Sequence, residues 1–135
     1  MKILIDANIL LDVLQNREPH VQDSSVIWKL CETEKVKGYV SALTFANLVY
    51  IMRKELDPKK IEETLQALSL IFEFADFSAS DLLRAAELYW GDFEDAVQSV
   101  TAEWIHADYI ITRNVRDFTK SKVVAFTPSE LIARI

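Results

Sequence analysis

Residues 3–6 read Ile3-Leu4-Ile5-Asp6, an apolar run that ends in a carboxylate. A continuous apolar run bounded by polar residues is typical of a strand buried on both faces of a parallel sheet. Asp95 stands near the start of a predicted helix, and Asp117 follows a second apolar strand predicted at 108–112. In an open parallel sheet, groups just beyond the carboxyl ends of the strands converge on one crevice. We therefore expect these three carboxylates to share one site.

Several carboxylates in one crevice repel each other unless a divalent cation neutralises them. Oxygen ligands of this kind suit Mg²⁺ or Mn²⁺. We expect Asp6, Asp95 and Asp117 to be the catalytic residues and to hold one or two such ions, mainly through water. The ions would activate a water molecule and stabilise the charge that develops on a phosphodiester.

The rest of the chain alternates between strand and helix patterns. Strands are predicted at residues 2–6, 39–41, 74–77, 108–112 and 122–126. Helices are predicted at residues 8–14, 18–35, 42–55, 58–72, 78–90 and 92–107, with a last one from 127. This alternation predicts a three-layer α/β/α sandwich around a mostly parallel central sheet, formed by one domain over residues 1–135.

The composition limits the classes of protein. The chain has 135 residues, half of them hydrophobic, which is enough for one globular core. Its net charge of −6 and pI near 4.9 lack the broad basic surface of most nucleic-acid-binding proteins, although a metal site relaxes that objection. The single cysteine, Cys31, excludes a disulfide framework. Neither a signal peptide nor an apolar run of about 20 residues is present, so we expect a cytoplasmic protein without a membrane partner.

The helix predicted from Asp92 has two distinct faces. Its apolar stripe, expected to face the sheet, comprises Phe93, Val97, Val100 and Trp104. Asp92, Asp95, Ser99 and Ala102 share another face, which leaves room for a metal and a phosphate. We expect Asp92 to cap this helix, and it is also a further candidate metal ligand.

Polar residues around the two central strands are candidates for positioning the substrate. Asn8 can orient Asp6 through a hydrogen bond, and it can also cap the first helix. Thr112 and Asn114 are neutral groups suited to holding a water molecule or a phosphate oxygen. Arg113 and Arg116 are candidates for guiding a phosphate backbone, against the alternative that they are ordinary solvated charges.

Three motifs in this order resemble the PIN-domain nucleases, most closely the VapC-type toxin ribonucleases of toxin–antitoxin pairs. They are residues 3–12 (ILIDANILLD), 92–98 (DFEDAVQ) and 111–118 (ITRNVRDF). The resemblance covers essentially the whole chain. It implies Mg²⁺- or Mn²⁺-dependent cleavage of single-stranded RNA, a homodimer, and neutralisation by a cognate antitoxin. Candidate surfaces for the dimer are Ser24–Leu30 and Ile61–Phe72.

One position departs from the family pattern. The second acid of the family is a glutamate, and the order of the motifs places Asn47 there. Asn47 can offer a carbonyl oxygen to a metal or to its water but adds no charge. A catalytically impaired PIN-like module that only binds RNA or protein therefore stays open as an alternative. A phosphotransfer domain with Asp6 as acceptor is a further alternative.

Overall fold

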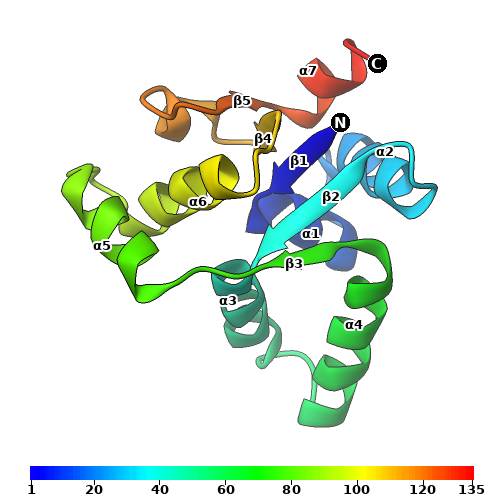
Figure 1. Ribbon diagram of the computed structural model, residues 1–135. Helices are drawn as coiled ribbons and strands as arrows, with labels where there is room; N and C mark the ends of the chain where they lie inside the picture. Colours follow the sequence, from blue (N-terminus) through cyan, green and yellow to red (C-terminus); the bar gives the residue numbers. More distant parts are fainter.

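The computed structural model describes residues 1–135, and its centre is a five-stranded parallel sheet (Figure 1). The strands are β1 (Lys2–Ile5), β2 (Lys37–Ser41), β3 (Glu73–Ala75), β4 (Tyr109–Ile111) and β5 (Val124–Phe126). Their order across the sheet is β3-β2-β1-β4-β5, and all four neighbouring pairs are parallel. The predicted α/β sandwich with a mostly parallel sheet is confirmed.

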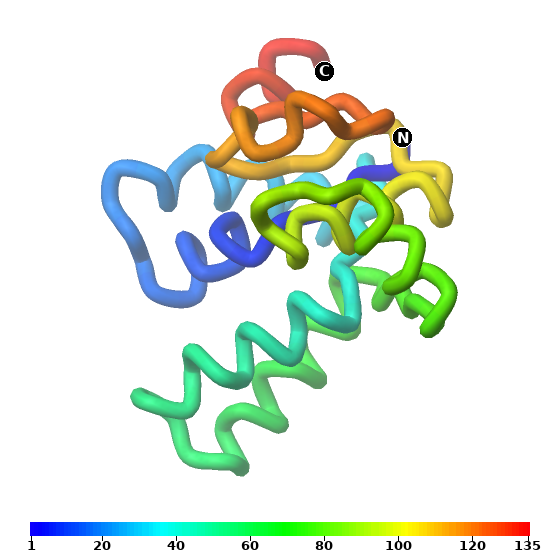
Figure 2. The backbone as a smooth tube through the Cα atoms, turned by 90° about the vertical axis from the view of Figure 1, so that its left-hand side faces the viewer, coloured from blue at the N-terminus to red at the C-terminus, as the bar shows by residue number.

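Seven α-helices and one short 3-10 helix connect the strands. The α-helices are α1 (Ala7–Leu14), α2 (Val21–Glu32), α3 (Ala42–Met52), α4 (Pro58–Ile71), α5 (Ala79–Glu87), α6 (Phe93–Trp104) and α7 (Pro128–Ile132). The 3-10 helix η1 (Val115–Phe118) lies in a segment for which the sequence predicts neither a helix nor a strand. Figure 2 shows α3 and α4 side by side, extending away from the rest of the molecule. No helix combines the length and the apolar character that a membrane crossing would require.

Successive side chains of a strand point to opposite faces of the sheet, so the core forms two layers. Ile3 and Ile5 of β1 belong to the larger cluster, which also holds apolar side chains of α1, α2, α3, α4 and α7. Leu4, between them, faces the opposite way and packs with Ala102 of α6. The strands are thus buried on both faces, as their continuous apolar runs predict.

Side-chain caps explain where several helices begin. Asp57 accepts a hydrogen bond from the amide of Lys60 and precedes Pro58 at the start of α4. Ser78 forms a capping box at α5, and Asp92 accepts from the amide of Asp95 at α6. The cap of α1 is Asp6, whose carboxylate accepts from the amide of Ala7. The prediction that Asn8 caps this helix is therefore wrong.

Two other local predictions also fail. The second helix begins at Val21 rather than at Glu18, after a cis peptide bond between Glu18 and Pro19. The helix α5 does not continue to Trp90: it ends at Glu87, and Tyr89 takes the left-handed conformation with a φ of 55°.

The apolar stripe predicted on α6 is correct only in its centre. Val97 and Val100 are buried, but Phe93 and Trp104 at the two ends are exposed. The buried residues of α6 also include Gln98, whose side chain donates a hydrogen bond to Asp6.

Candidate functional site

The strand order reverses between β1 and β4, the point where parallel α/β sheets bind ligands. After β1 the chain forms β2 and β3 on one side, and β4 returns to the other side of β1. Asp6 directly follows β1 and Thr112 directly follows β4. The amide of Asp6 donates to the carbonyl of Ile111 at 2.9 Å, so the two strand ends lie side by side.

The carboxylate of Asp6 accepts hydrogen bonds from four groups, which belong to three segments: α1, α6 and the end of β4. Oδ1 accepts from the amide of Ala7 at 2.8 Å and from Nε2 of Gln98 at 2.9 Å. Oδ2 accepts from Oγ1 of Thr112 at 2.7 Å and, at a longer 3.4 Å, from Nδ2 of Asn8. Asp6 therefore has a fixed orientation, which a ligand to a metal or substrate needs.

The predicted polar partners surround Asp6 as a small network. Oγ1 of Thr112 accepts a hydrogen bond from the amide of Asn114 at 3.0 Å. Oδ1 of Asn8 accepts from the amide of Arg113 at 3.4 Å. The segment after β4 is thus tied to the segment after β1. Thr112 and Asn8 act on Asp6 directly, whereas Asn114 is placed here through its backbone.

Asp95 lies on α6 near this network, and four other acids surround it. Burial raises the pKa of Asp95 to about 7, with repulsion from Asp92, Asp6, Asp117 and Glu94 adding to the effect. Asp6 and Asp117, the other two predicted catalytic aspartates, therefore both lie close enough to Asp95 to act on it electrostatically. A divalent cation bound among these carboxylates would offset their mutual repulsion. The cluster therefore fits a site for a divalent ion. No three acidic, histidine or cysteine side chains, however, are close enough to ligate one ion directly.

A cleft of about 290 Å³ adjoins these acids. Its lining residues are Tyr89, Trp90, Gly91, Asp92, Asp95, Arg116, Asp117, Thr119 and Lys120. Three aspartates and two cations thus border one opening. Arg116, which was expected to guide the phosphate backbone of the substrate, lines this cleft. Lys120 also lines it, although it is not among the predicted site residues.

Arg113 lies elsewhere. Its Nε donates to Oδ2 of Asp12 at 3.0 Å, and Asp12 is completely buried. Oδ2 of Asp12 also accepts from Oγ of Ser24 at 2.9 Å. Arg113 lines a separate cavity with His20 and Asp23. The structure does not bring this predicted substrate contact into the acidic cleft.

Asn47 and Glu94 form a pair at the edge of the site. Nδ2 of Asn47 on α3 donates to Oε2 of Glu94 on α6 at 3.0 Å. The position expected to carry the second acid is thus joined to a carboxylate from another helix. Glu94 also contributes to the raised pKa of Asp95.

Sequence reasoning did not identify three of these participants. Gln98 contacts Asp6 from one turn beyond Asp95, so its place on the Asp95 face was a usable signal. Asp12 interrupts the apolar pattern of α1, and a charge at such a position indicates a buried partner. Glu94 lies in the first turn of α6, where an acid is favoured by the helix dipole alone, so its residue type carries no separate signal.

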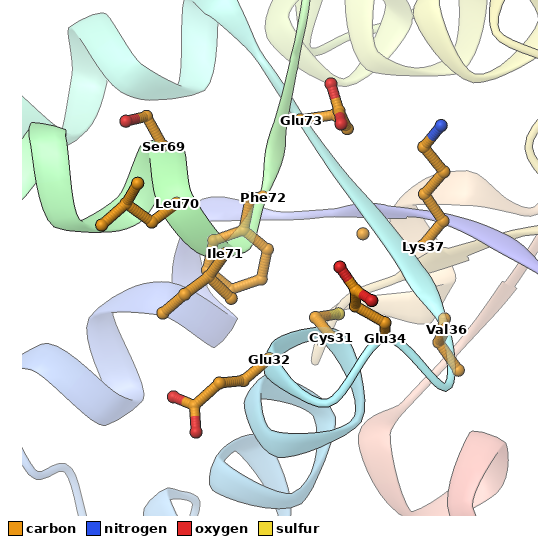
Figure 3. A pocket seen from close by; sticks show the side chains of 11 residues that line it. Cys31, Glu32, Glu34, Val36, Lys37, Ser69, Leu70, Ile71, Phe72 and Glu73 are labelled. Carbon is orange, nitrogen blue, oxygen red and sulfur yellow. The ribbon is translucent and has the colours of Figure 1, made fainter.

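A second cavity, of about 370 Å³, lies at the opposite edge of the sheet, where β2 and β3 begin (Figure 3). Cys31 of α2 lies on its wall, and burial raises the pKa of the Cys31 thiol to about 12. A thiol with this pKa is not a nucleophile near neutral pH. Gly38 allows the close packing here, since a Cβ would lie 2.6 Å from Sγ of Cys31. This cavity is separate from the acidic site.

A family model of the PIN domain matches residues 2–116. The chain therefore belongs to the PIN-domain family, and the resemblance inferred from the three acidic motifs is confirmed. A comparison with curated protein sequences found no match.

Several solved structures share the fold. A toxin–antitoxin complex from Klebsiella pneumoniae is 24% identical with a TM-score of 0.72, covering 93% of this chain and 97% of that chain. VapBC-1 from nontypeable Haemophilus influenzae is 16% identical with a TM-score of 0.71, covering 96% and 99%. VapC20 from Mycobacterium tuberculosis, described as a sarcin–ricin loop cleaving toxin, is 10% identical with a TM-score of 0.65, covering 80% and 86%. At these identities the similarity concerns the fold.

Proposed function

We propose that residues 1–135 form one divalent-metal-dependent endoribonuclease domain that cleaves single-stranded RNA as the toxin of a type II toxin–antitoxin pair. The observation that carries this proposal is the gathering of Asp6, Asp95 and Asp117 at the switch point of the sheet, beside a cleft that also presents cations. Membership of the PIN family supports it, as does the description of VapC20, a structural neighbour, as a sarcin–ricin loop cleaving toxin.

The metal, Mg²⁺ or Mn²⁺, would be held by Asp6, Asp95 and Asp117. Asp92 and Asn47 are additional candidate ligands, and Glu94 can add charge through its contact with Asn47. Since no three acids are close enough to ligate one ion directly, some of these contacts would pass through water. The bound ion would supply an activated water and charge stabilisation at the phosphate.

Other residues of the chain orient Asp6 and attract the substrate. Thr112, Asn8 and Gln98 hold the carboxylate of Asp6 in one orientation. Arg116 and Lys120 line the cleft, where their charges can attract the RNA phosphates against the net negative charge of the protein. These cations make no ion pair of their own in the structure, so their charge is available to a ligand.

The test is metal-dependent cleavage of a single-stranded RNA by the purified chain. Cleavage is expected with Mn²⁺ or Mg²⁺, not with EDTA, and it should disappear in Asp95→Asn. Asp76→Asn is the matched control, because Asp76 is an exposed aspartate directly after β3 that does not line the acidic cleft. Cleavage that persists in Asp95→Asn or in EDTA would contradict the proposal.

Asn47 is the observation that favours the second candidate, a PIN-like module that binds RNA or protein without cleaving. This module predicts binding of RNA with no cleavage at any concentration of Mn²⁺. A phosphotransfer role for Asp6 finds no support, because both of its carboxylate oxygens accept hydrogen bonds from the protein and the chain is a PIN domain.

A cognate antitoxin and a homodimer complete the proposal. Two of the similar structures are described as a toxin–antitoxin complex and as VapBC-1. A small protein encoded beside this chain should therefore co-purify with it and inhibit cleavage. Failure of that protein to bind would contradict the toxin assignment while leaving the nuclease proposal intact.

A further inference from the structure

Tyr89 is the most exposed large hydrophobic side chain of the molecule, with 91% of its surface accessible, and it borders the acidic cleft. The next residue, Trp90, lines the same cleft but packs edge-on against Phe118. Trp90 is thus anchored in the protein, whereas Tyr89 makes no aromatic contact. An aromatic ring in this position presents both faces to a ligand.

The backbone makes the choice of tyrosine here unusual. Tyr89 has a φ of 55° just after the end of α5. Glycine or asparagine is preferred at such a position, and a bulky residue is disfavoured there. Packing within the protein does not compensate, since the side chain is exposed. A residue held in a disfavoured conformation beside a site points to a role in that site.

The neighbours of Tyr89 define the chemistry of its ligand. Arg116 and Lys120 line the same cleft, and neither takes part in any of the ion pairs of the structure. Asp92, Asp95 and Asp117 complete the lining. A ring beside cations matches a nucleotide, whose base has an apolar face and whose phosphate is anionic. An apolar peptide segment would not match, because five of the nine lining residues are charged.

We propose that Tyr89 is a stacking platform for one base of the single-stranded RNA substrate. This inference rests on the proposed function and adds to it the residue that binds a base next to the phosphate to be cleaved. Stacking would be tolerant of base identity, because every base has a π face. Because a base paired within a duplex is not free to stack on a protein side chain, the same contact would favour unpaired RNA.

The test measures binding of a short, fluorescein-labelled, single-stranded RNA of mixed sequence by anisotropy. The parent is the full chain carrying Asp95→Asn, so that the RNA is not cleaved. Tyr89→Ala should weaken binding about tenfold, whereas Tyr89→Phe should bind within about twofold of the parent. The matched control is Tyr50→Ala, because Tyr50 is an exposed tyrosine on α3 outside the cleft.

Two further readouts separate stacking from charge and from folding. An abasic RNA of the same length should bind Tyr89→Ala and the parent equally. Lys120→Ala should reduce the slope of log K for binding against log salt concentration by about one in magnitude. Tyr89→Ala should leave this slope unchanged. Tyr89→Asn should be at least as stable as the parent, because asparagine tolerates this conformation, and it should bind RNA as weakly as Tyr89→Ala.

The outcomes distinguish this inference from the function on which it rests. If the parent binds RNA and Tyr89→Ala binds it equally, the stacking role is wrong and the nuclease proposal stands. If the parent binds no single-stranded RNA while the unmodified chain cleaves it, the stacking role is wrong and the nuclease proposal stands. If the unmodified chain neither binds nor cleaves single-stranded RNA, both are wrong. If Tyr89→Asn unfolds or loses stability, Tyr89 is held by packing within the protein and the stacking role is again overturned.

Discussion

The side-chain amide of Asn47 donates a hydrogen bond of 3.0 Å to the carboxylate of Glu94. This contact joins α3 to the first turn of α6 and lies where the PIN resemblance places a second acid. Glu94 in turn raises the pKa of Asp95. The negative charge that Asn47 lacks is thus present within hydrogen-bond distance of it, on a neighbouring helix.

Glu94→Gln should therefore weaken Mn²⁺ binding, and Asn47→Asp should tighten it by about tenfold, or ~1.4 kcal/mol. The reason is that each anionic group near the site raises the affinity for a dication. Titration calorimetry of the metal-free protein measures both changes. Asn16→Asp is the control, since it adds the same charge in the turn after α1. Unchanged affinity in both variants would place the Asn47–Glu94 pair outside the metal site.

The fold and the proximity of Asp6, Asp95 and Asp117 were predictable because they depend on local patterns. An apolar run that ends at Asp6 predicts both a buried strand and the location of its carboxylate at the sheet edge. Asp92 was recognised as a cap from its place before an amphipathic segment. Each of these signals spans only a few neighbouring residues, so it can be recognised in a single sequence.

The contacts that complete the site could not be predicted in this way. The bond from Gln98 to Asp6 joins residues 92 positions apart, and that from Arg113 to Asp12 joins residues 101 positions apart. Each depends on how a helix is rotated against the sheet, which periodicity does not define. Arg113 illustrates the consequence: its polar neighbours indicate a substrate contact, but its side chain reaches a buried acid instead.

Asp6→Asn and Asp95→Asn should have opposite effects on the stability of the metal-free protein. Asparagine at position 95 removes repulsion with the surrounding acids, so the free energy of unfolding should stay the same or rise. At position 6, the side-chain NH₂ group of the new asparagine would face a donor, either Gln98 or Thr112, both of which donate to Asp6. The lost hydrogen bond should lower the free energy of unfolding by about 1–3 kcal/mol. Urea unfolding in EDTA measures both. Equal losses in the two variants would show that Asp95 is also a structural residue.

The stability of the metal-free protein should depend on pH through Asp95. Its pKa of about 7 in the folded protein lies above the ordinary 3.8. Between these values the folded state binds more protons than the unfolded state, so the contribution of Asp95 to stability falls as the pH rises from about 4 to about 7. Asp95→Asn should flatten this dependence, as measured by urea unfolding at several pH values in EDTA. An identical dependence in the variant would contradict the raised pKa.

The purified chain should be a dimer in solution. The two surfaces expected from the sequence are only partly available, since Ser24 and Ile27 are fully buried within the protein. Val26 and Leu70 remain exposed on them, at 41% and 88%. Leu70→Glu should therefore shift the protein towards monomer if α4 takes part. Light scattering across micromolar concentrations measures this, and a monomer in the unmodified chain would contradict the prediction.

Arg113→Ala should destabilise the protein by about 3–5 kcal/mol, because it removes the cation that pairs with a fully buried carboxylate. Oδ1 of Asp12 already has no hydrogen-bond partner, and Oδ2 would keep only Ser24. Lys122→Ala is the matched control: it breaks a 3.9 Å ion pair with Glu103 whose lysine is 83% exposed, so it should cost at most about 1 kcal/mol. The same urea titrations compare the two. The prediction is wrong if Arg113→Ala is as stable as the control and instead weakens RNA binding. Arg113 would then guide the phosphate backbone of the RNA, as the sequence predicts, and its contact with Asp12 would add little to stability.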